Sequence, residues 1–138
     1  MSNKTVSAIM TIEPVIGNPS SSFSQVLRLF TEFPVHHLPI VDDDNKLIGI
    51  VSSNDLPKVF TQLCNRPEKI KMDFSSIDSA ISIADIMTSN PFTITSNTTI
   101  EEAAKIFASH KFLAVPVVDN GTLLGILSAK DVMKYLAE

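Results

Sequence analysis

Apolar positions along this chain follow two periods, and the same succession of periods occurs twice. In residues 23–30 and 100–107 the apolar side chains recur at i, i+3, i+4 and i+7, the spacing of a helix with one buried face. Each predicted helix precedes two short β-prone runs, at 37–41 and 46–51 in the first half and at 114–118 and 122–127 in the second. Another helix is expected to follow each second run.

Two shorter features come before each helix. A short apolar turn is expected at 6–10 and again at 83–87. Pro14 and Pro91 then bias their neighbours toward extended backbone, which predicts brief strands at 15–16 and 92–94. Each half therefore has the predicted order β-α-β-β-α.

The two halves are copies of one unit. Ile9-Met10-Thr11 matches Ile86-Met87-Thr88, and Gly49-Ile50-Val51-Ser52-Ser53-Asn54-Asp55 matches Gly125-Ile126-Leu127-Ser128-Ala129-Lys130-Asp131. We expect one repeat in residues 1–60, a connecting segment in 61–82 that holds the end of one helix, and a second repeat in 83–138.

Local signals set the expected ends of several elements. Thr98 with Glu101 has capping-box spacing at the second helix, and serines 20 to 22 offer caps at the first. Asp119-Asn120-Gly121 predicts a tight hairpin, because Asn-Gly accepts the positive φ that such turns require.

Composition narrows the class of protein. The chain has 138 residues, 44% of them hydrophobic, which is enough for one compact core. Its formal net charge of -4 comes from mixed charges without a basic face, so no nucleic-acid partner is predicted. Cys64, the single cysteine, cannot form an internal disulfide, and no apolar segment suggests a signal peptide or membrane insertion. A cytoplasmic location is therefore expected.

The repeated Ser-x-x-Asp has two interpretations. A serine at the end of a strand and an aspartate three residues later can form a helix cap, in which the hydroxyl and the carboxylate accept from backbone amides. The same groups can bind a ligand, since a carboxylate accepts from two neighbouring hydroxyls and amides at a helix start favour phosphate. The residues alone leave both interpretations open.

The ordered set of these motifs, occurring twice, resembles a tandem pair of CBS domains, also called a Bateman module. The resemblance covers nearly all of residues 6–136 and rests on Ile-Met-Thr, Leu/Val-Pro-[IV]-Val-Asp and Gly-Ile-[VL]-Ser-x-x-Asp. It implies an α/β (α+β) fold of two β-α-β-β-α repeats, packed sheet to sheet with pseudo-twofold symmetry. It also implies inter-repeat clefts for AMP, ADP, ATP or S-adenosylmethionine, and association into homodimers.

The resemblance implies a role for particular residues. Asp55 and Asp131 would bind ribose, and Ser52 and Ser128 would contact phosphate or ribose. The adenine pocket would be walled by residues of the first strand and of the segment before the Leu/Val-Pro element: Ile16, Gly17, His37, Leu38, Thr93, Ile94, Ala114 and Val115.

The two copies are not equivalent. Lys130 could meet a phosphate as a mobile positive charge, whereas its counterpart is the neutral Asn54. Pro57 would disturb a helix that began at Ser52. A helix beginning nearer Asp55 would relieve this but would move the carboxylate. We therefore expect the second repeat to hold the better phosphate-facing site.

Two function classes follow. The first is a regulatory module that senses an adenosine-type ligand and signals to a protein partner; the alternative is a ligand-free structural module that acts through its dimer surface. An enzyme is not predicted, because no phosphate-binding Gly-rich loop or Cys/His arrangement is present. His36 and His37 would point to opposite faces of a strand, so no metal site and no obligatory cofactor are expected. The extent of the repeats favours a stand-alone protein.

Overall fold

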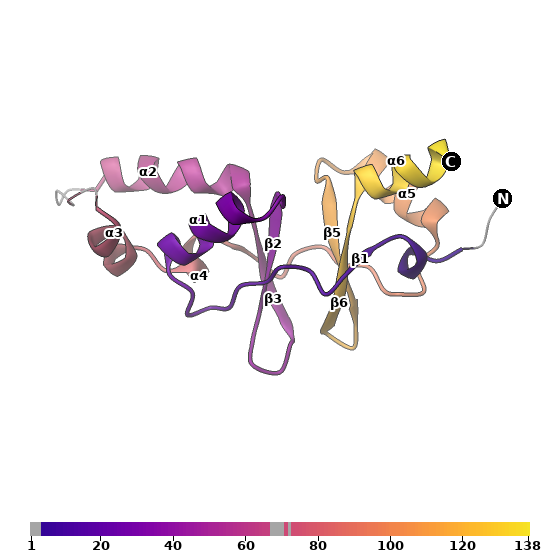
Figure 1. The fold of residues 1–138 in the computed structure, drawn as a ribbon, viewed down its shortest axis with the longest axis horizontal. Helices are drawn as coiled ribbons and strands as arrows, with labels where there is room; N and C mark the ends of the chain where they lie inside the picture. Colours follow the sequence, from indigo (N-terminus) through magenta and orange to yellow (C-terminus); the bar gives the residue numbers. More distant parts are fainter. Residues whose placement is uncertain (1–3, 67–70, 72) are drawn as a thin grey trace. The chain divides into compact units, whose positions relative to one another are not determined.

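The computed structural model describes residues 4–66, 71 and 73–138. Residues 1–3 of the predicted first repeat and 67–70 and 72 of the predicted connection lie outside the described residues. The two amphipathic helices are confirmed as α1 (Phe23–Glu32) and α5 (Ile100–Ser109). Figure 1 traces the order of the elements along the chain.

The four longer strands are also confirmed. They are β2 (His37–Val41), β3 (Leu47–Ser52), β5 (Ala114–Asp119) and β6 (Thr122–Ser128). The brief first strand of each repeat is reduced to one bridging residue, Gly17 beside Ile40 and Ile94 beside Val117, both parallel.

The remaining helical elements are short. The apolar turns form η1 (Val6–Ala8) and α4 (Ile83–Ile86), while α6 (Ala129–Ala137) follows β6 directly. After β3 the chain first makes the 3-10 turn η2 (Ser53–Asp55) and then α2 (Leu56–Cys64). Within the connection lies α3 (Phe74–Ala80), a seven-residue helix that was not predicted from the sequence.

One predicted helix cap is wrong by one residue. Thr99, not Thr98, caps α5, and its hydroxyl accepts from the Glu102 amide at 3.1 Å. Both threonines fit a cap by composition, and Thr98 instead accepts from the Thr95 amide in the preceding turn. At α1 the expected serine cap is Ser22, paired reciprocally with Gln25.

Contacts divide the described chain into two compact units. Unit 1 comprises residues 1–14, 44–47 and 91–138, and unit 2 comprises 15–43 and 48–90. The opening segment of the first repeat therefore lies in unit 1 with most of the second repeat. The opening segment of the second repeat lies in unit 2 with most of the first. The tip of the β2–β3 loop also belongs to unit 1, where Leu47 donates to the Gly121 carbonyl at 3.0 Å and Asn45 accepts from the Leu123 amide at 3.0 Å.

The exchange completes a three-stranded sheet in each unit. In unit 1 the order is β1-β6-β5, where β1 (Thr11–Ile12) runs antiparallel to β6. In unit 2 the order is β2-β3-β4, where β4 (Thr88–Ser89) runs antiparallel to β3. The repeated Ile-Met-Thr segment thus forms the edge of a sheet whose centre belongs to the other repeat.

Each sheet has a separate apolar core under its helices. In unit 2 the core includes Phe23, Val26, Leu38 and Ile40, which join α1 to β2. In unit 1 it includes Ile100, Val115, Val117 and Leu127, which join α5 to β5 and β6. α5 and α6 lie beside one another in unit 1 (Figure 1). The predicted α+β fold with two repeats is confirmed.

The repeated glycine of Gly-Ile-[VL]-Ser allows the edge segment to approach the central strand. A Cβ at Gly125 would lie 2.5 Å from the Thr11 carbonyl oxygen, and a Cβ at Gly49 would lie 2.5 Å from the Met87 sulfur. Side chains at these positions would therefore push the edge segment away. The glycine in the motif has a packing reason that is independent of any ligand.

The two glycines differ in what blocks a larger residue, and this predicts different stabilities. We expect Gly125→Ala to destabilise the fold by about 1–3 kcal/mol, because the obstructing Thr11 carbonyl is backbone. Gly49→Ala should cost less, because the Met87 thioether can move and the nearest backbone atom, the Thr88 carbonyl oxygen, lies 3.0 Å away. Urea unfolding measures both.

Removing the methionines provides the control. Met87→Ala should offset part of the loss in Gly49→Ala, whereas Met10→Ala should not restore Gly125→Ala. Equal stabilities of the two alanine variants would contradict this account.

None of the helices among the described residues has the length and apolar character needed to cross a bilayer.

Candidate functional site

The Ser-x-x-Asp turn stands at the same place in both units, where the central strand ends. Ser128 is the last residue of β6, and Ser52 is the last residue of β3. The next amide in each turn donates to the residue that precedes the neighbouring strand, from Ala129 to the Leu113 carbonyl and from Ser53 to the His36 carbonyl, both at 2.9 Å. Both turns are thereby held against the first residues of the adjacent strand.

In unit 1 the turn forms a complete capping box. The Ser128 amide donates to Oδ2 of Asp131 at 2.9 Å, and the Asp131 amide donates to the Ser128 hydroxyl at 3.1 Å. The capping interpretation of this motif is therefore confirmed. Oδ1 of Asp131 makes no hydrogen bond or ion pair with any residue that the structure describes. Because the cap uses only one carboxylate oxygen, the aspartate retains an acceptor for a ligand.

In unit 2 both oxygens of the corresponding carboxylate, Asp55, have interactions. The Ser52 amide donates to Oδ2 of Asp55 at 2.8 Å, and Lys58 Nζ lies 3.4 Å from Oδ1. The Asp55 side chain is 17% exposed and that of Lys58 72% exposed, so solvent screens this ion pair and it contributes at most about 1 kcal/mol. Both oxygens of Asp55 thus have a partner within the chain.

Pro57 is accommodated by the start of α2. Since α2 begins at Leu56, Pro57 lies in its first turn, where a missing amide hydrogen costs no helical hydrogen bond. The helix therefore begins next to Asp55, the start that avoids a clash at Pro57. Ser52 is followed by the 3-10 turn η2, whereas Ser128 is followed directly by the α-helical turn of α6.

The basic residue of the second motif lies on the surface. Lys130 is the second residue of α6 and is exposed. It has no carboxylate partner within residues 4–66, 71 and 73–138. Its counterpart Asn54 is also exposed, in the middle of η2. The two turns therefore differ by one unpaired positive charge.

The predicted adenine-pocket residues separate into two groups. Leu38, Ile94 and Val115 belong to the apolar cores at 0%, 5% and 1% exposure, so their side chains are turned away from solvent. Gly17 and Ala114 are buried as well. In the described structure these five residues can therefore face a ligand only through their backbone.

The other predicted pocket residues retain accessible surface. Ile16 is 41% exposed, and His37 and Thr93 are half-buried. Since Leu38 and Ile40 point into the core, strand alternation places His37 on the opposite face of β2. Ile16 and His37 in unit 2, and Thr93 in unit 1, are the predicted pocket side chains that a ligand could reach.

His37 has a perturbed charge. Burial lowers its pKa from the usual 6.5 and the neighbouring His36 lowers it further, while Asp55 raises it. The neutral ring is therefore favoured in the folded chain. Between the folded pKa and 6.5 the unfolded chain binds more protons, so this group makes the fold more stable as pH rises through that window.

The two charged neighbours of His37 should shift its titration in opposite directions. In an NMR titration we expect its midpoint below 6.5, lower still in Asp55→Asn and higher in His36→Gln. His37→Gln should weaken the fall in stability on acidification through the same window. An increase of the midpoint in Asp55→Asn would show that the carboxylate does not act on this ring.

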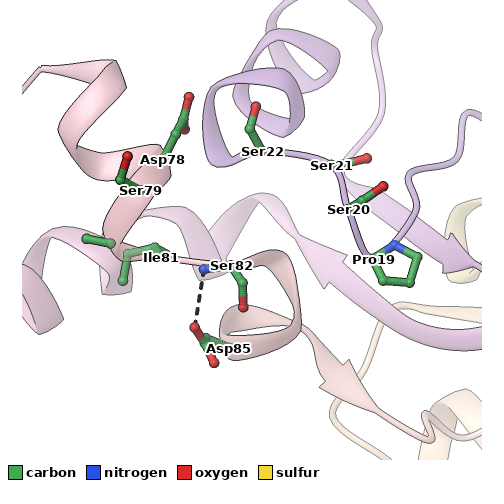
Figure 2. A pocket seen from close by; sticks show the side chains of 10 residues that line it. Pro19, Ser20, Ser21, Ser22, Asp78, Ser79, Ile81, Ser82 and Asp85 are labelled. Carbon is green, nitrogen blue, oxygen red and sulfur yellow. Dashed lines mark hydrogen bonds between the residues drawn. The ribbon is translucent and has the colours of Figure 1, made fainter.

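A groove in unit 2 was missed by sequence reasoning. It has a volume of about 430 Å³ and lies between the start of α1 and the α3–α4 connection, and Figure 2 shows serines and two aspartates around it. Asp78 accepts from the Ser24 amide at 2.9 Å and from its hydroxyl at 2.6 Å, so this carboxylate already has partners. Because α3 forms one wall and was not predicted, no sequence signal indicated the groove.

A capping box at the groove offers an internal comparison for the motif. The Ser82 amide donates to Oδ2 of Asp85 at 3.2 Å, drawn as a dashed line in Figure 2. Ser82 and Asp85 share the spacing of Ser128 and Asp131 but open the short helix α4 rather than follow a central strand. The spacing alone therefore specifies a cap. Groups of His, Cys, Asp or Glu that could hold a metal ion are absent from the part of the chain that the structure describes.

Both halves of the chain match one known family of protein domains. The profile described as "CBS domain" matches this chain twice, at residues 6–60 and 83–138. The chain belongs to the CBS domain family. Both matches contain one Ser-x-x-Asp turn, so the two turns occupy equivalent places in two CBS domains.

Individual relatives agree with a CBS pair. The chain is 32% identical over 133 residues to CBS domain-containing protein CBSX2 of Arabidopsis thaliana, covering 84% of this chain and 56% of that protein. It is 34% identical over 126 residues to inosine-5'-monophosphate dehydrogenase of Staphylococcus epidermidis, covering 89% of this chain and 22% of that enzyme. The chain thus spans about half or less of these relatives.

Among solved structures, CBSX2 in complex with AMP has a TM-score of 0.80 and 31% identity, covering 97% of this chain and 96% of that one. The likeness extends over both CBS domains. The described chain is thus built as a tandem CBS pair.

Proposed function

We propose that this CBS pair is a regulatory module that binds an adenosine-type ligand, with the turn of unit 1 as its principal site. The proposal rests on the two carboxylate oxygens of Asp131. Oδ2 caps α6, while Oδ1 has no partner among the described residues. A carboxylate oxygen in this position can accept from ribose hydroxyls. Ser128 and Lys130 would contact phosphate at the start of α6.

The AMP complex of CBSX2 supports the choice of ligand class. That protein shares the fold over nearly its whole chain at 31% identity. AMP, ADP, ATP and S-adenosylmethionine are the ligands we propose to compare, without an obligatory cofactor. Thr93, Ile94, Ala114 and Val115 in unit 1, and Ile16, Gly17, His37 and Leu38 in unit 2, remain the proposed surroundings of adenine.

The module would act by signalling and without catalysis of its own. The match to inosine-5'-monophosphate dehydrogenase covers 22% of that enzyme, so the enzyme's activity is not proposed for this chain. A ligand transmits a signal only if it binds two states of the protein unequally, and we propose that a protein partner responds to the favoured state. The exposed, unpaired Cys64 is consistent with the reducing cytoplasm that we propose as its location.

The variant Asp131→Asn should lose ligand binding but keep most of the helix cap. Asp131→Asn retains a side-chain oxygen for the Ser128 amide but loses the charge, so it should lower stability without ligand by no more than about 1 kcal/mol. In the wild type, AMP at a hundred times its dissociation constant should stabilise the fold by about 2.7 kcal/mol, and Asp131→Asn should remove most of this gain. Thermal unfolding with and without AMP measures both effects.

Asp85→Asn is the matched control. It changes the equivalent residue of a capping box without a proposed ligand, so it should retain the AMP-dependent gain. If no adenosine ligand stabilises a folded wild-type protein, the sensing function is wrong and the alternative, a structural module acting through its dimer surface, is favoured.

We further propose that the module is a homodimer that uses the outer face of α6. Met133 and Leu136 lie on this helix and are exposed, Leu136 by 68%, although both are apolar. Leu113 is 66% exposed, and its backbone carbonyl accepts from the first amide of α6. Contact with a second copy would cover these side chains.

A charge within this apolar region should disrupt the dimer. We expect Leu136→Lys to convert the protein to a monomer in sedimentation velocity, with little loss of thermal stability at low concentration because the side chain is exposed. Lys134→Glu, a charge change on the same helix outside the apolar set, is the control and should remain dimeric. A wild-type protein that sediments as a monomer at tens of micromolar would refute the proposal.

A further inference from the structure

We propose that the two turns select adenosine ligands by charge. The turn of unit 1 binds a phosphorylated nucleotide, and the turn of unit 2 binds an adenosine ligand that lacks phosphate. This inference rests on the proposed function, because it assigns a ligand class to each site within it.

The two turns offer different charges to a ligand. In unit 1 the exposed Lys130 has no carboxylate partner among the described residues. In unit 2 its place is taken by Asn54, and the nearby cation Lys58 is already paired with Asp55 at 3.4 Å. A phosphate entering unit 1 therefore meets an unpaired ammonium group, whereas in unit 2 it would have to draw Lys58 from its partner.

The backbone that follows each serine also differs between the two turns. α6 starts immediately after Ser128 and runs for nine residues, so its first amides and its dipole favour an anion at that end. The chain after Ser52 makes only a three-residue 3-10 turn before α2 begins at Leu56. The favourable field for phosphate is therefore stronger after Ser128.

The predicted adenine surroundings also differ in polarity between the two units. Unit 2 has the apolar Ile16, 41% exposed, where unit 1 has the half-buried Thr93. Next to Asp55 lies His37, whose pKa is lowered by burial, so the ring carries little positive charge at neutral pH. Apart from the Lys58–Asp55 pair, these residues of unit 2 are apolar or mainly neutral. Each carboxylate oxygen can accept two hydrogen bonds, so Oδ1 of Asp55 can accept from ribose while it stays paired with Lys58.

An exchange of the two motif residues tests this inference. Isothermal titration with AMP and with adenosine would be measured on the wild type, Lys130→Asn and Asn54→Lys. Asp131→Asn and Asp55→Asn would assign each binding event to one turn. Lys111→Asn removes an exposed lysine of unit 1 outside the motif and controls for the change in net charge.

We expect Asp131→Asn to abolish AMP binding and Asp55→Asn to abolish adenosine binding. Lys130→Asn should weaken AMP about tenfold, as loss of one charge-assisted contact would, and leave adenosine within about twofold. Asn54→Lys should create a second AMP site that Asp55→Asn removes. Lys111→Asn should leave both affinities unchanged.

These measurements distinguish charge selection by the two turns from adenosine binding itself. If both ligands bind but Lys130→Asn leaves the ratio of AMP to adenosine affinity unchanged, charge selection is wrong while adenosine binding stands. If Asp55→Asn weakens AMP as much as Asp131→Asn does, the assignment to separate turns is wrong. If neither ligand binds the folded protein, both proposals are wrong.

Discussion

The close approach of an edge segment to a glycine of the central strand is the contact on which each sheet depends. β1 and β4 each contribute only two residues, and both residues of each strand are exposed, so these strands bury little by themselves. They remain in place because Gly125 and Gly49 leave room for a methionine side chain and a threonine carbonyl. Since β1 belongs to the first repeat but pairs with β6 of the second, and β4 belongs to the second but pairs with β3 of the first, this packing also exchanges segments between the repeats.

The same central strands position the candidate sites. Gly125 lies three residues before Ser128 in β6, and Gly49 lies three residues before Ser52 in β3. A strand held by its edge partner presents its terminal serine at a defined place, where the following amide is bound by the start of the neighbouring strand. Strand packing and helix capping thus cooperate to orient one aspartate in each unit.

Capping and ligand binding were opposed interpretations of the motif, and the geometry shows why they need not exclude each other. A carboxylate has two oxygens, and the cap occupies one. In unit 1 the second oxygen of Asp131 has no partner among the described residues, whereas in unit 2 Lys58 lies beside the second oxygen of Asp55. This difference in carboxylate pairing therefore arises one helical turn beyond the motif, at Lys58, whose role the spacing of Ser and Asp does not reveal.

The sequence by itself determined the repeat, the α+β class, the four longer strands and the two amphipathic helices, because apolar periodicity and turn residues act over a few neighbouring positions. It also indicated the serine and aspartate of each turn. Only the tertiary structure decided which sheet each Met-Thr segment completes, since a two-residue strand carries no signal for its partner. The burial of Leu38, Ile94 and Val115, the pairing of Lys58 with Asp55 and the groove beside α3 were likewise decided there, because each depends on contacts between segments distant in sequence or on side-chain orientation.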